Sequence, residues 1–274
     1  MFRCPICCGS MQMIQSKSLI CSNRHCFDLA KQGYVNLLPR VNKTKYDKPL
    51  FEYRRLICNN GFFDPLTTRI SEIIRGHLHD DGPTRLLDAG CGEGSHLTKI
   101  QQNLSPCATG SLLAVGIDIA KEGIIAAATE YSNAIWCVAD LAKCPFADQQ
   151  FHFILNILSP ANYSEFRRLM LDEGMVIKVV PERDHLIEIR DRVYEGFAKE
   201  AYSNANIRNQ FKEHFTIMNV DHVRYQVNVN ERLIGPLLGM TPLTWRLTAE
   251  GLLSMHSRDL RKVTMDFMIL VGMK

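Results

Sequence analysis

The feature that most constrains the fold of this chain is a glycine-rich turn between a short apolar run and a helical segment. Residues 85–94 read Arg-Leu-Leu-Asp-Ala-Gly-Cys-Gly-Glu-Gly, and helical spacing follows over 95–104. Glycines at such a turn let the backbone bend sharply and approach a ligand, with the N–H groups of the following helix close by. The turn therefore predicts a strand–loop–helix unit that binds a small molecule.

Short apolar runs alternate with helical segments from this turn onward. The apolar runs predict buried strands at 85–88, 112–118, 134–140, 151–157 and 175–180. The spacing between them predicts helices at 95–104, 121–131 and 162–172. Five buried strands joined by helices are typical of an α/β fold with a parallel, doubly wound, Rossmann-like sheet. The tail predicts two closing strands, 215–227 and 265–273, with a helical insertion between them.

The composition and the first residues place the chain among ordinary globular proteins. Of its residues, 46% are hydrophobic and 22% are charged, which excludes collagen-like and disordered chains. No stretch approaches the run of about 20 apolar residues that a transmembrane helix needs, so no membrane partner is expected. The first residues form no apolar signal core. We therefore expect a cytoplasmic protein, in which thiols stay reduced.

Five of the ten cysteines lie in the first 26 residues, and this cluster predicts a metal site. In a reducing compartment, a dense group of thiols binds metal rather than forming disulfides. A Cys-x2-Cys pair and a Cys-x3-His pair offer four ligands with no open position, which favours one structural Zn²⁺. On spacing alone Cys26 could replace the histidine, and Cys8 lies beside the first pair. The four candidate ligands are Cys4, Cys7, Cys21 and His25.

The N-terminal segment is predicted to be a small module of its own. Residues 1–38 are too few to bury a stable core, so a metal must stabilise a zinc-ribbon-like fold. Residues 39–60 are expected to form a linker and a helix at 51–60. Residues 61–274 are expected to form the larger domain, which begins with a second helix at 65–78.

Charge is unevenly distributed between the N-terminal segment and the rest of the chain. Residues 1–48 hold eight Lys or Arg and two Asp, a net charge of +6, whereas the whole chain carries +3 and the remainder therefore −3. A basic module on a mildly acidic body predicts a polyanionic partner such as nucleic acid. A solvated basic surface is the alternative.

The glycine turn and three acidic residues predict binding of S-adenosylmethionine. A dinucleotide-binding turn would read Gly-x-Gly-x-x-Gly, whereas the third glycine here comes one residue earlier. Asp88 precedes the turn and suits a cationic ligand, and S-adenosylmethionine carries a sulfonium and an amino group. Asp118 and Asp140 end the next two strands, where they can accept from the ribose hydroxyls and the adenine amino group. The candidate cofactor-binding residues are Asp88, Gly90, Gly92, Gly94, Asp118 and Asp140.

Several motifs along nearly the whole chain resemble those of the bacterial 23S rRNA (guanine-N1)-methyltransferases of the RlmA type. The most specific one is Phe27-Asp-Leu-Ala-Lys-Gln-Gly-Tyr-Val-Asn-Leu-Leu-Pro39, which follows the two metal-ligand pairs. The glycine turn over residues 87–94, by itself, indicates only a methyltransferase. The remaining shared motifs are Gly116-x-Asp118, Pro181, His185-Leu186 and Met240-Thr-Pro-Leu-Thr-Trp-Arg246.

The resemblance implies a specific enzyme activity. It implies methyl transfer from S-adenosylmethionine to N1 of a guanine in a hairpin of domain II of 23S rRNA. It also implies that Cys4, Cys7, Cys21 and His25 bind the zinc, and that Cys26 does not. Further cofactor contacts are implied at Phe63, Gly92, Glu93 and His185.

The sequence departs from the family pattern in two places. Asp172-Glu-Gly174 precedes the fifth predicted strand, and Asn156-Ile-Leu-Ser-Pro160 ends the fourth, where it is expected to line the substrate side and leaves base selection open. Trp245 and Arg246 are candidates for RNA contact.

Other functions remain compatible with these motifs. One is methylation of another RNA or of a small molecule by a chain whose zinc module is only structural, and another is an RNA-binding module on an inactive methyltransferase fold. The sequence also leaves open the guanine modified, the general base, naked rRNA or an assembling subunit as the substrate, and whether the protein acts as a homodimer.

Overall fold

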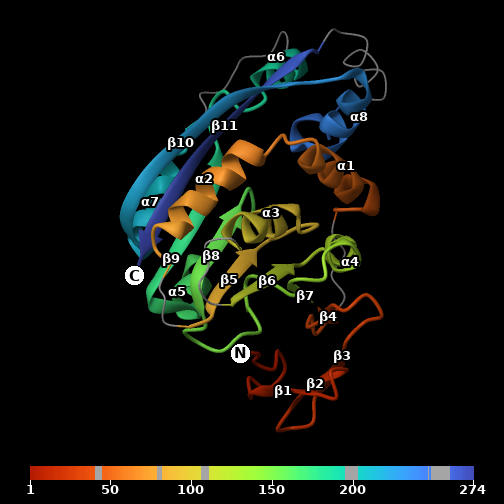
Figure 1. Cartoon of the computed structure of the whole chain (residues 1–274), viewed down its shortest axis with the longest axis vertical. Coiled ribbons are helices and arrows are strands. Elements are labelled where there is room, and N and C mark those ends of the chain that lie inside the picture. Colours follow the sequence, from red (N-terminus) through yellow and green to blue (C-terminus); the bar gives the residue numbers. More distant parts are fainter. Residues whose placement is uncertain (41–44, 79–81, 106–110, 195–202, 246, 248–259) are drawn as a thin grey trace.

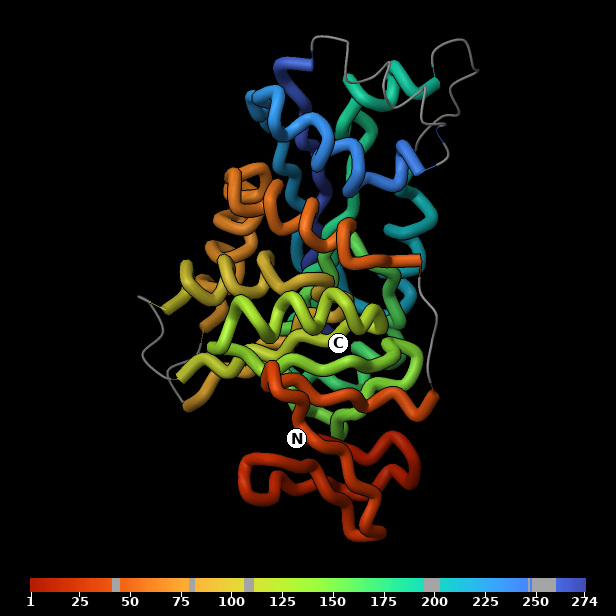
Figure 2. Tube along the Cα trace, turned by 90° about the vertical axis from the view of Figure 1, so that its right-hand side faces the viewer, coloured from red at the N-terminus to blue at the C-terminus, as the bar shows by residue number. Residues whose placement is uncertain are grey.

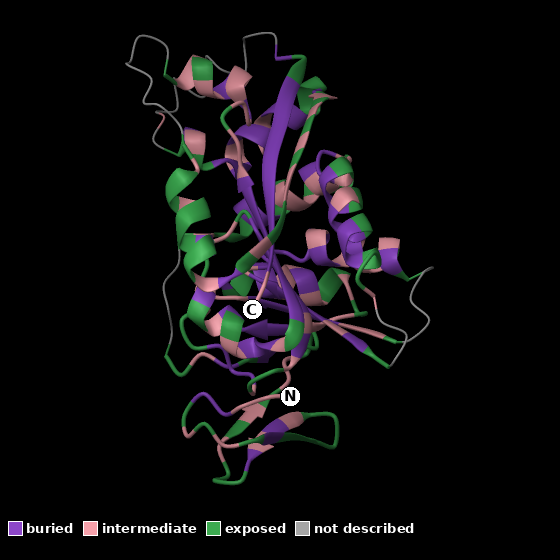
Figure 3. Cartoon of the chain, turned by 90° about the vertical axis from the view of Figure 1, so that its left-hand side faces the viewer, coloured by how far each residue is buried: buried purple, intermediate pink, exposed green. Residues whose placement is uncertain are grey.

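The computed structural model describes residues 1–274 except 41–44, 79–81, 106–110, 195–202, 246 and 248–259 (Figure 1). The described strands form a three-stranded sheet near the N-terminus and an eight-stranded sheet with the order β10-β11-β9-β8-β5-β6-β7-β4. Buried residues follow the strands of the large sheet, as Figure 3 shows. No helix among the described residues is long and apolar enough to cross a membrane.

The centre of the large sheet is parallel, as the sequence predicts. Its strands are β5 (Thr84–Ala89), β6 (Leu112–Asp118), β7 (Ile135–Val138), β8 (Phe151–Ile157) and β9 (Met170–Pro181). The connecting helices are α3 (Ser95–Leu104), α4 (Lys121–Glu130) and α5 (Tyr163–Leu169). The expected helix at 162–172 is too long, because buried Met170 already pairs with Phe151 of β8.

The predicted closing strands form a long antiparallel hairpin. They are β10 (Thr216–Asn228) and β11 (Lys262–Met273), and β11 continues the sheet by antiparallel pairing with β9 (Figure 1). Helices α6 (Ile187–Val193) and α7 (Ala205–His214) lie between β9 and β10. The expected insertion between the two hairpin strands contains α8 (Glu231–Met240) and the 3₁₀ turn η1 (Pro242–Thr244).

Two helices precede the large sheet, and the first begins earlier than expected. Helix α1 covers Lys48–Asn59 because the Asp47 carboxylate accepts from the N–H of Leu50, 3.1 Å away, and caps the first turn. Helix α2 covers Asp64–Arg75 and ends before the expected residue 78. Helix α1 contacts α3, α4 and α8, so it lies across the helices near the glycine turn (Figure 2).

The N-terminal module has its own sheet but is joined to the large one. Its strands are β1 (Met11–Ile14), β2 (Ser18–Cys21) and β3 (Cys26–Asp28). The next strand, β4 (Val35–Asn36), pairs in parallel with β7 and forms an edge of the large sheet. Phe2 forms a β-bridge with Phe146, and their rings lie 5.4 Å apart. The module therefore shares backbone pairing and apolar packing with the larger domain.

Candidate functional site

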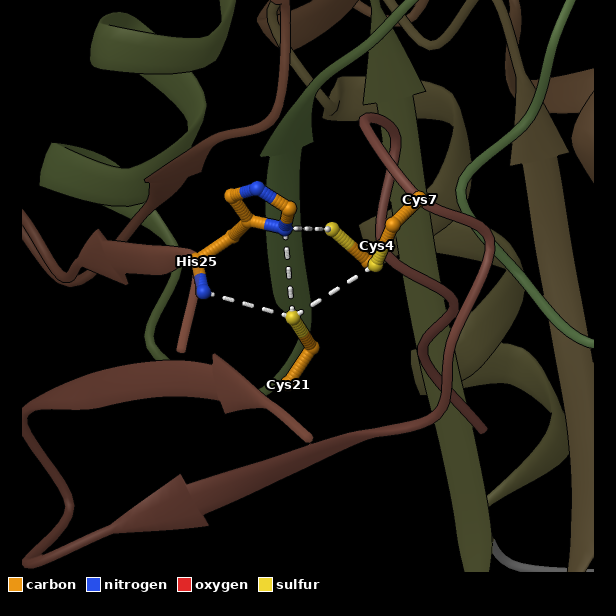
Figure 4. A group of neighbouring side chains, drawn as sticks. All are labelled: Cys4, Cys7, Cys21 and His25. Carbon is orange, nitrogen blue, oxygen red and sulfur yellow. Dashed lines mark hydrogen bonds between the residues drawn. The ribbon is translucent and has the colours of Figure 1, made fainter. Parts of the chain in front are cut away.

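Four side chains of the N-terminal module converge on one point, as Figure 4 shows. The Sγ atoms of Cys7 and Cys21 lie 3.7 Å apart. His25 Nδ1 lies 3.6 Å from Cys4 Sγ and 3.4 Å from Cys21 Sγ. A tetrahedral zinc with bonds of about 2.3 Å to sulfur and about 2.0 Å to nitrogen has S···S edges of about 3.8 Å and S···N edges of about 3.5 Å. These distances fit a Cys3His zinc site in which His25 binds through Nδ1.

The backbone around the cluster orients the ligands. The N–H of His25 donates to Cys21 Sγ over 3.3 Å. A hydrogen bond from the backbone at Gly9 lowers the pKa of the Cys7 thiol to about 6, which favours the metal-binding thiolate. Cys26 is exposed, its Sγ lies 3.5 Å from Asp28 Oδ1, and it is not among the four converging side chains. Cys8 is exposed as well.

The glycine turn connects β5 to α3 in the position that the sequence predicts. Gly90 has a φ of +86°, and a Cβ there would collide with the side chain of Ser159. Gly94 has a φ of +85°, and a Cβ there would lie 2.5 Å from Trp136 Cη2. Only glycine combines this backbone conformation with such close packing. The turn is therefore fixed by its surroundings, with the first turn of α3 directly behind it.

Asp88 is a buried carboxyl group at the start of the turn. It is 1% exposed, and its Oδ1 has no hydrogen-bond partner among the described residues. Burial, with the nearby acidic side chains of Asp118 and Glu93, raises the pKa of Asp88 to about 8. A buried acceptor without a partner costs free energy unless a ligand satisfies it. An ammonium group would donate to it and a sulfonium would be attracted by its charge, and S-adenosylmethionine carries both.

Asp118 ends β6, and Asp140 lies two residues beyond the end of the neighbouring strand β7. Asp118 accepts from the N–H groups of Gly92 and Ala120, each over 2.8 Å. The N–H of Ala139 donates to the Asp118 carbonyl over 3.0 Å, so Asp140 follows one residue beyond that bond. Both acids therefore lie at the sheet edge that carries the glycine turn, which fits the ribose and adenine contacts expected of them.

Glu93 forms hydrogen bonds with the first residue of α3, the helix that follows the glycine turn. Its carboxylate accepts from the N–H and the hydroxyl of Ser95, over 3.0 and 2.7 Å, and the residue is 5% exposed. Burial raises the pKa of Glu93. The side chain therefore stabilises the first turn of α3, and its expected contact with the cofactor stays a prediction.

Phe63 and His185 are linked through Phe267, which the sequence patterns did not single out. The Phe267 ring lies 6.0 Å from the Phe63 ring and 4.6 Å from the His185 ring. Phe63 also packs edge-on against His96, at 4.8 Å, in the first turn of α3. Burial, with nearby Arg190, lowers the pKa of His185 to about 4, so its imidazole is neutral. The structure thus packs Phe63 against the first turn of α3 and His185 against β11, and the expected cofactor contacts of both residues stay predictions.

A buried polar network holds the segment after β8 against the glycine turn. Asn156 is fully buried, and its amide donates to the carbonyls of Ala89 and Pro160 over 2.7 and 3.0 Å. The Lys178 ammonium, in a residue that is 5% exposed, donates to Asn156 Oδ1 and to the Ser159 carbonyl. Asn156 is therefore an enclosed structural residue, and the expectation that the segment 156–160 lines the substrate side stays a prediction. Polar residues inside two apolar runs were the signal for this network.

Comparison with known proteins agrees with this geometry. Residues 2–45 match the N-terminal zinc-ribbon family of RlmA, and residues 86–173 match a methyltransferase domain family. A solved structure described as a type II methyltransferase from Anaeromyxobacter dehalogenans has the same fold, with a TM-score of 0.51, 14% identity and coverage of 75% of this chain and 95% of that one. Fold and site together define a methyltransferase with an N-terminal zinc ribbon.

Two curated relatives identify the family. YxjB of Bacillus subtilis (strain 168), assigned by name to the 23S rRNA (guanine-N1)-methyltransferases, is 41% identical over 100% of this chain and 97% of its own length. The 23S rRNA (guanine(748)-N1)-methyltransferase of Streptomyces fradiae is 30% identical over 89% of this chain and 85% of its own length. The chain belongs to the 23S rRNA (guanine-N1)-methyltransferase family.

Proposed function

We propose that this enzyme transfers a methyl group from S-adenosylmethionine to N1 of one guanine in a hairpin of domain II of 23S rRNA. The name of the Streptomyces fradiae relative gives guanine 748 as its target, and a guanine at or beside that position is the substrate proposed here. The observation that carries the donor assignment is the buried Asp88 carboxyl at the glycine turn, whose Oδ1 has no hydrogen-bond partner within the part of the chain that the structure describes.

The cofactor contacts follow from the same arrangement. Asp88 would accept from the cationic end of the cofactor, and the backbone from Gly90 to Gly94 would lie against it. Asp118 would accept from the ribose hydroxyls, and Asp140 from the adenine amino group. The further contacts proposed, from family resemblance, are those of Phe63, Glu93 and His185.

Replacing Asp118 tests the cofactor site. Asp118→Ala removes the ribose acceptor and also the partner of the Gly92 N–H, so the dissociation constant of S-adenosylhomocysteine should rise at least about tenfold, equivalent to about 1.4 kcal/mol. Asp172→Ala is the matched control, because Asp172 is exposed and pairs with Lys274. Calorimetry gives both values, and unchanged affinity in Asp118→Ala would contradict the ribose assignment.

The reaction demands mainly positioning from the protein. Guanine N1 carries a proton and is paired in a helix, so an unpaired or flipped guanine must be selected. Bound S-adenosylmethionine would supply a sulfonium methyl group open to in-line attack by N1. The chain's contribution is to hold both reactants in that geometry. The bonds from Asn156 and Lys178 fix the backbone at Ser159 and Pro160 beside Gly90, and this segment is proposed to line the substrate side.

The N-terminal module is proposed to bind one structural Zn²⁺ and to contact the RNA. Four protein ligands complete a tetrahedron and leave no position for catalysis. Three basic residues of the segment are exposed and are proposed to meet phosphates: Arg24, Lys31 and Arg40. Since the substrate proposed is ribosomal RNA, the location proposed is the cytoplasm.

Mapping of the methylated nucleotide tests the whole assignment. The protein is incubated with labelled S-adenosylmethionine and either 23S rRNA, a domain II hairpin or total cell protein. N1 methylation blocks base pairing, so primer extension should stop at one hairpin guanine. Label in another RNA, in protein or in a small molecule, without such a stop, would favour the alternative substrates.

A further inference from the structure

We propose that Trp245 and Tyr46 form the surface on which the unpaired guanine stacks before methylation. This inference rests on the proposed function and adds the residues that hold the base. The two rings come from segments far apart in the sequence and meet edge-on, with 6.0 Å between ring centres. Trp245 is 45% exposed and Tyr46 is half-buried, so part of the Trp245 indole is open to solvent.

A rigid turn holds the Trp245 indole in this exposed position. The turn follows α8 and consists of η1, whose N-cap Thr241 accepts from the N–H of Leu243 over 3.4 Å. Buried Thr244 donates its hydroxyl to the carbonyls of Leu238 and Thr241, over 2.5 and 3.1 Å. Hydrogen bonds of two buried threonines, Thr241 and Thr244, therefore fix the turn that precedes Trp245.

A series of side-chain contacts connects this surface to the glycine turn. The Arg54 guanidinium lies over the ring of Tyr46, at 5.8 Å, and over the ring of Phe51, at 5.7 Å. A Cβ at Gly92 would lie 3.7 Å from both Arg54 Nη1 and Phe51 Cε1. Arg54 also stabilises the ionised form of Asp118 by its charge. Tyr46 and Arg54 therefore link Trp245 to the glycine turn at which the cofactor is expected.

The chemistry of the cluster fits a nucleotide. Exposed aromatic rings stack on unpaired bases, and guanidinium groups add cation–π contacts and attract phosphate. A purine offers the largest stacking area of the RNA bases, in keeping with guanine as the target. The Arg54 guanidinium beside Tyr46 favours a nucleotide over an uncharged partner at this surface.

Kinetics of three variants test the proposal. Trp245→Ala should lower kcat/KM for the rRNA hairpin about tenfold or more, mainly through KM, while the S-adenosylhomocysteine dissociation constant changes less than about twofold. Trp245→Phe keeps a stacking ring and should recover most of the loss. Met218→Ala is the matched control, because Met218 is 56% exposed and lies on β10. Wild-type kinetics in Trp245→Ala, or an equal loss of S-adenosylhomocysteine affinity, would overturn the proposal.

Fluorescence provides a readout that needs no catalysis. The only other tryptophan, Trp136, is 2% exposed, so quenching by the rRNA hairpin reports on Trp245. Quenching should occur in the wild type and be absent from Trp245→Phe, and quenching that persists in Trp245→Phe would overturn the proposal. If the hairpin binds the wild-type protein and quenches its Trp245 fluorescence but no rRNA is methylated, the proposed function fails while the stacking surface is supported.

Discussion

Replacing Asp88 by asparagine is expected to stabilise the cofactor-free protein progressively as the pH rises. Burial and the acidic neighbours raise the pKa of Asp88 from 3.8 to about 8 in the folded protein. Between these values the unfolded chain binds fewer protons than the folded one, so the free energy of unfolding falls as the pH rises. At about 1.36 kcal/mol per pH unit, the penalty is about 2 kcal/mol at pH 5 and about 5 kcal/mol at pH 8. Asparagine does not ionise, so the Asp88→Asn variant does not carry this penalty.

Urea unfolding at several pH values measures this effect. The advantage of Asp88→Asn over the wild type should grow by about 3 kcal/mol between pH 5 and pH 8. Asp172→Asn is the control, because the pKa of Asp172 is lowered by Lys274 and both states are ionised in this range. Calorimetry of Asp88→Asn should show weaker binding of S-adenosylmethionine, since the cation loses its carboxylate. Parallel pH profiles for Asp88→Asn and the wild type would refute the reasoning.

Two further predictions concern the metal ligands and the buried lysine. Elemental analysis after dialysis should give about one zinc per chain in the wild type and in Cys26→Ser, and much less in His25→Ala; the reverse pattern would overturn the ligand set. Burial lowers the pKa of Lys178 from 10.5 to about 8. Between these pH values the unfolded chain binds more protons than the folded one, so the destabilisation caused by burying the charged lysine disappears as the pH rises. The resulting gain in the free energy of unfolding should be missing from Lys178→Met, and identical profiles for the two proteins would contradict a charged, buried Lys178.

Local patterns in the sequence were sufficient to predict the parallel sheet and the metal cluster. The apolar run at 151–157 is β8 residue for residue, and the helix at 95–104 is α3. Spacing predicted Cys4, Cys7 and Cys21 as ligands and left His25 or Cys26 as the fourth, and family resemblance chose His25, which the structure brings together with the three cysteines. These features could be predicted because each depends on residues close together in the chain, where periodicity and spacing are informative.

Contacts between distant segments could not be predicted from such patterns. Lys178 and Asn156 are polar residues within apolar strands, but their partners are set by the register of β8 and β9. Phe267 reaches Phe63 only because β11 pairs with β9. Strand β4 is too short to show periodicity, so its place at the edge of the large sheet depends on pairing with β7. Tertiary pairing decides each of these positions.

The contacts of β4 and Phe2 also change how the role of the N-terminal module must be tested. Removing residues 1–38 would delete β4, expose the edge of β7 and remove Phe2 from Phe146. Leu37 also donates to the Val138 carbonyl, over 2.9 Å, close to Asp140. A deletion would therefore disturb the larger domain near the cofactor site, and loss of methylation would not identify an RNA-binding surface.

Charge reversal on the exposed basic residues separates RNA binding from folding. Reversing Arg24, Lys31 and Arg40 to glutamate alters exposed side chains only, so zinc content and S-adenosylhomocysteine affinity should stay at wild-type values. If these residues meet phosphates, binding of the rRNA hairpin should weaken, and its salt dependence should become shallower by about 0.7–0.9 in log–log slope for each phosphate that is no longer neutralised. Arg208→Glu on α7 changes an exposed charge of the acidic body and should change neither quantity. Unaltered RNA affinity and salt slope in the triple variant would mean that the module only packs against the larger domain.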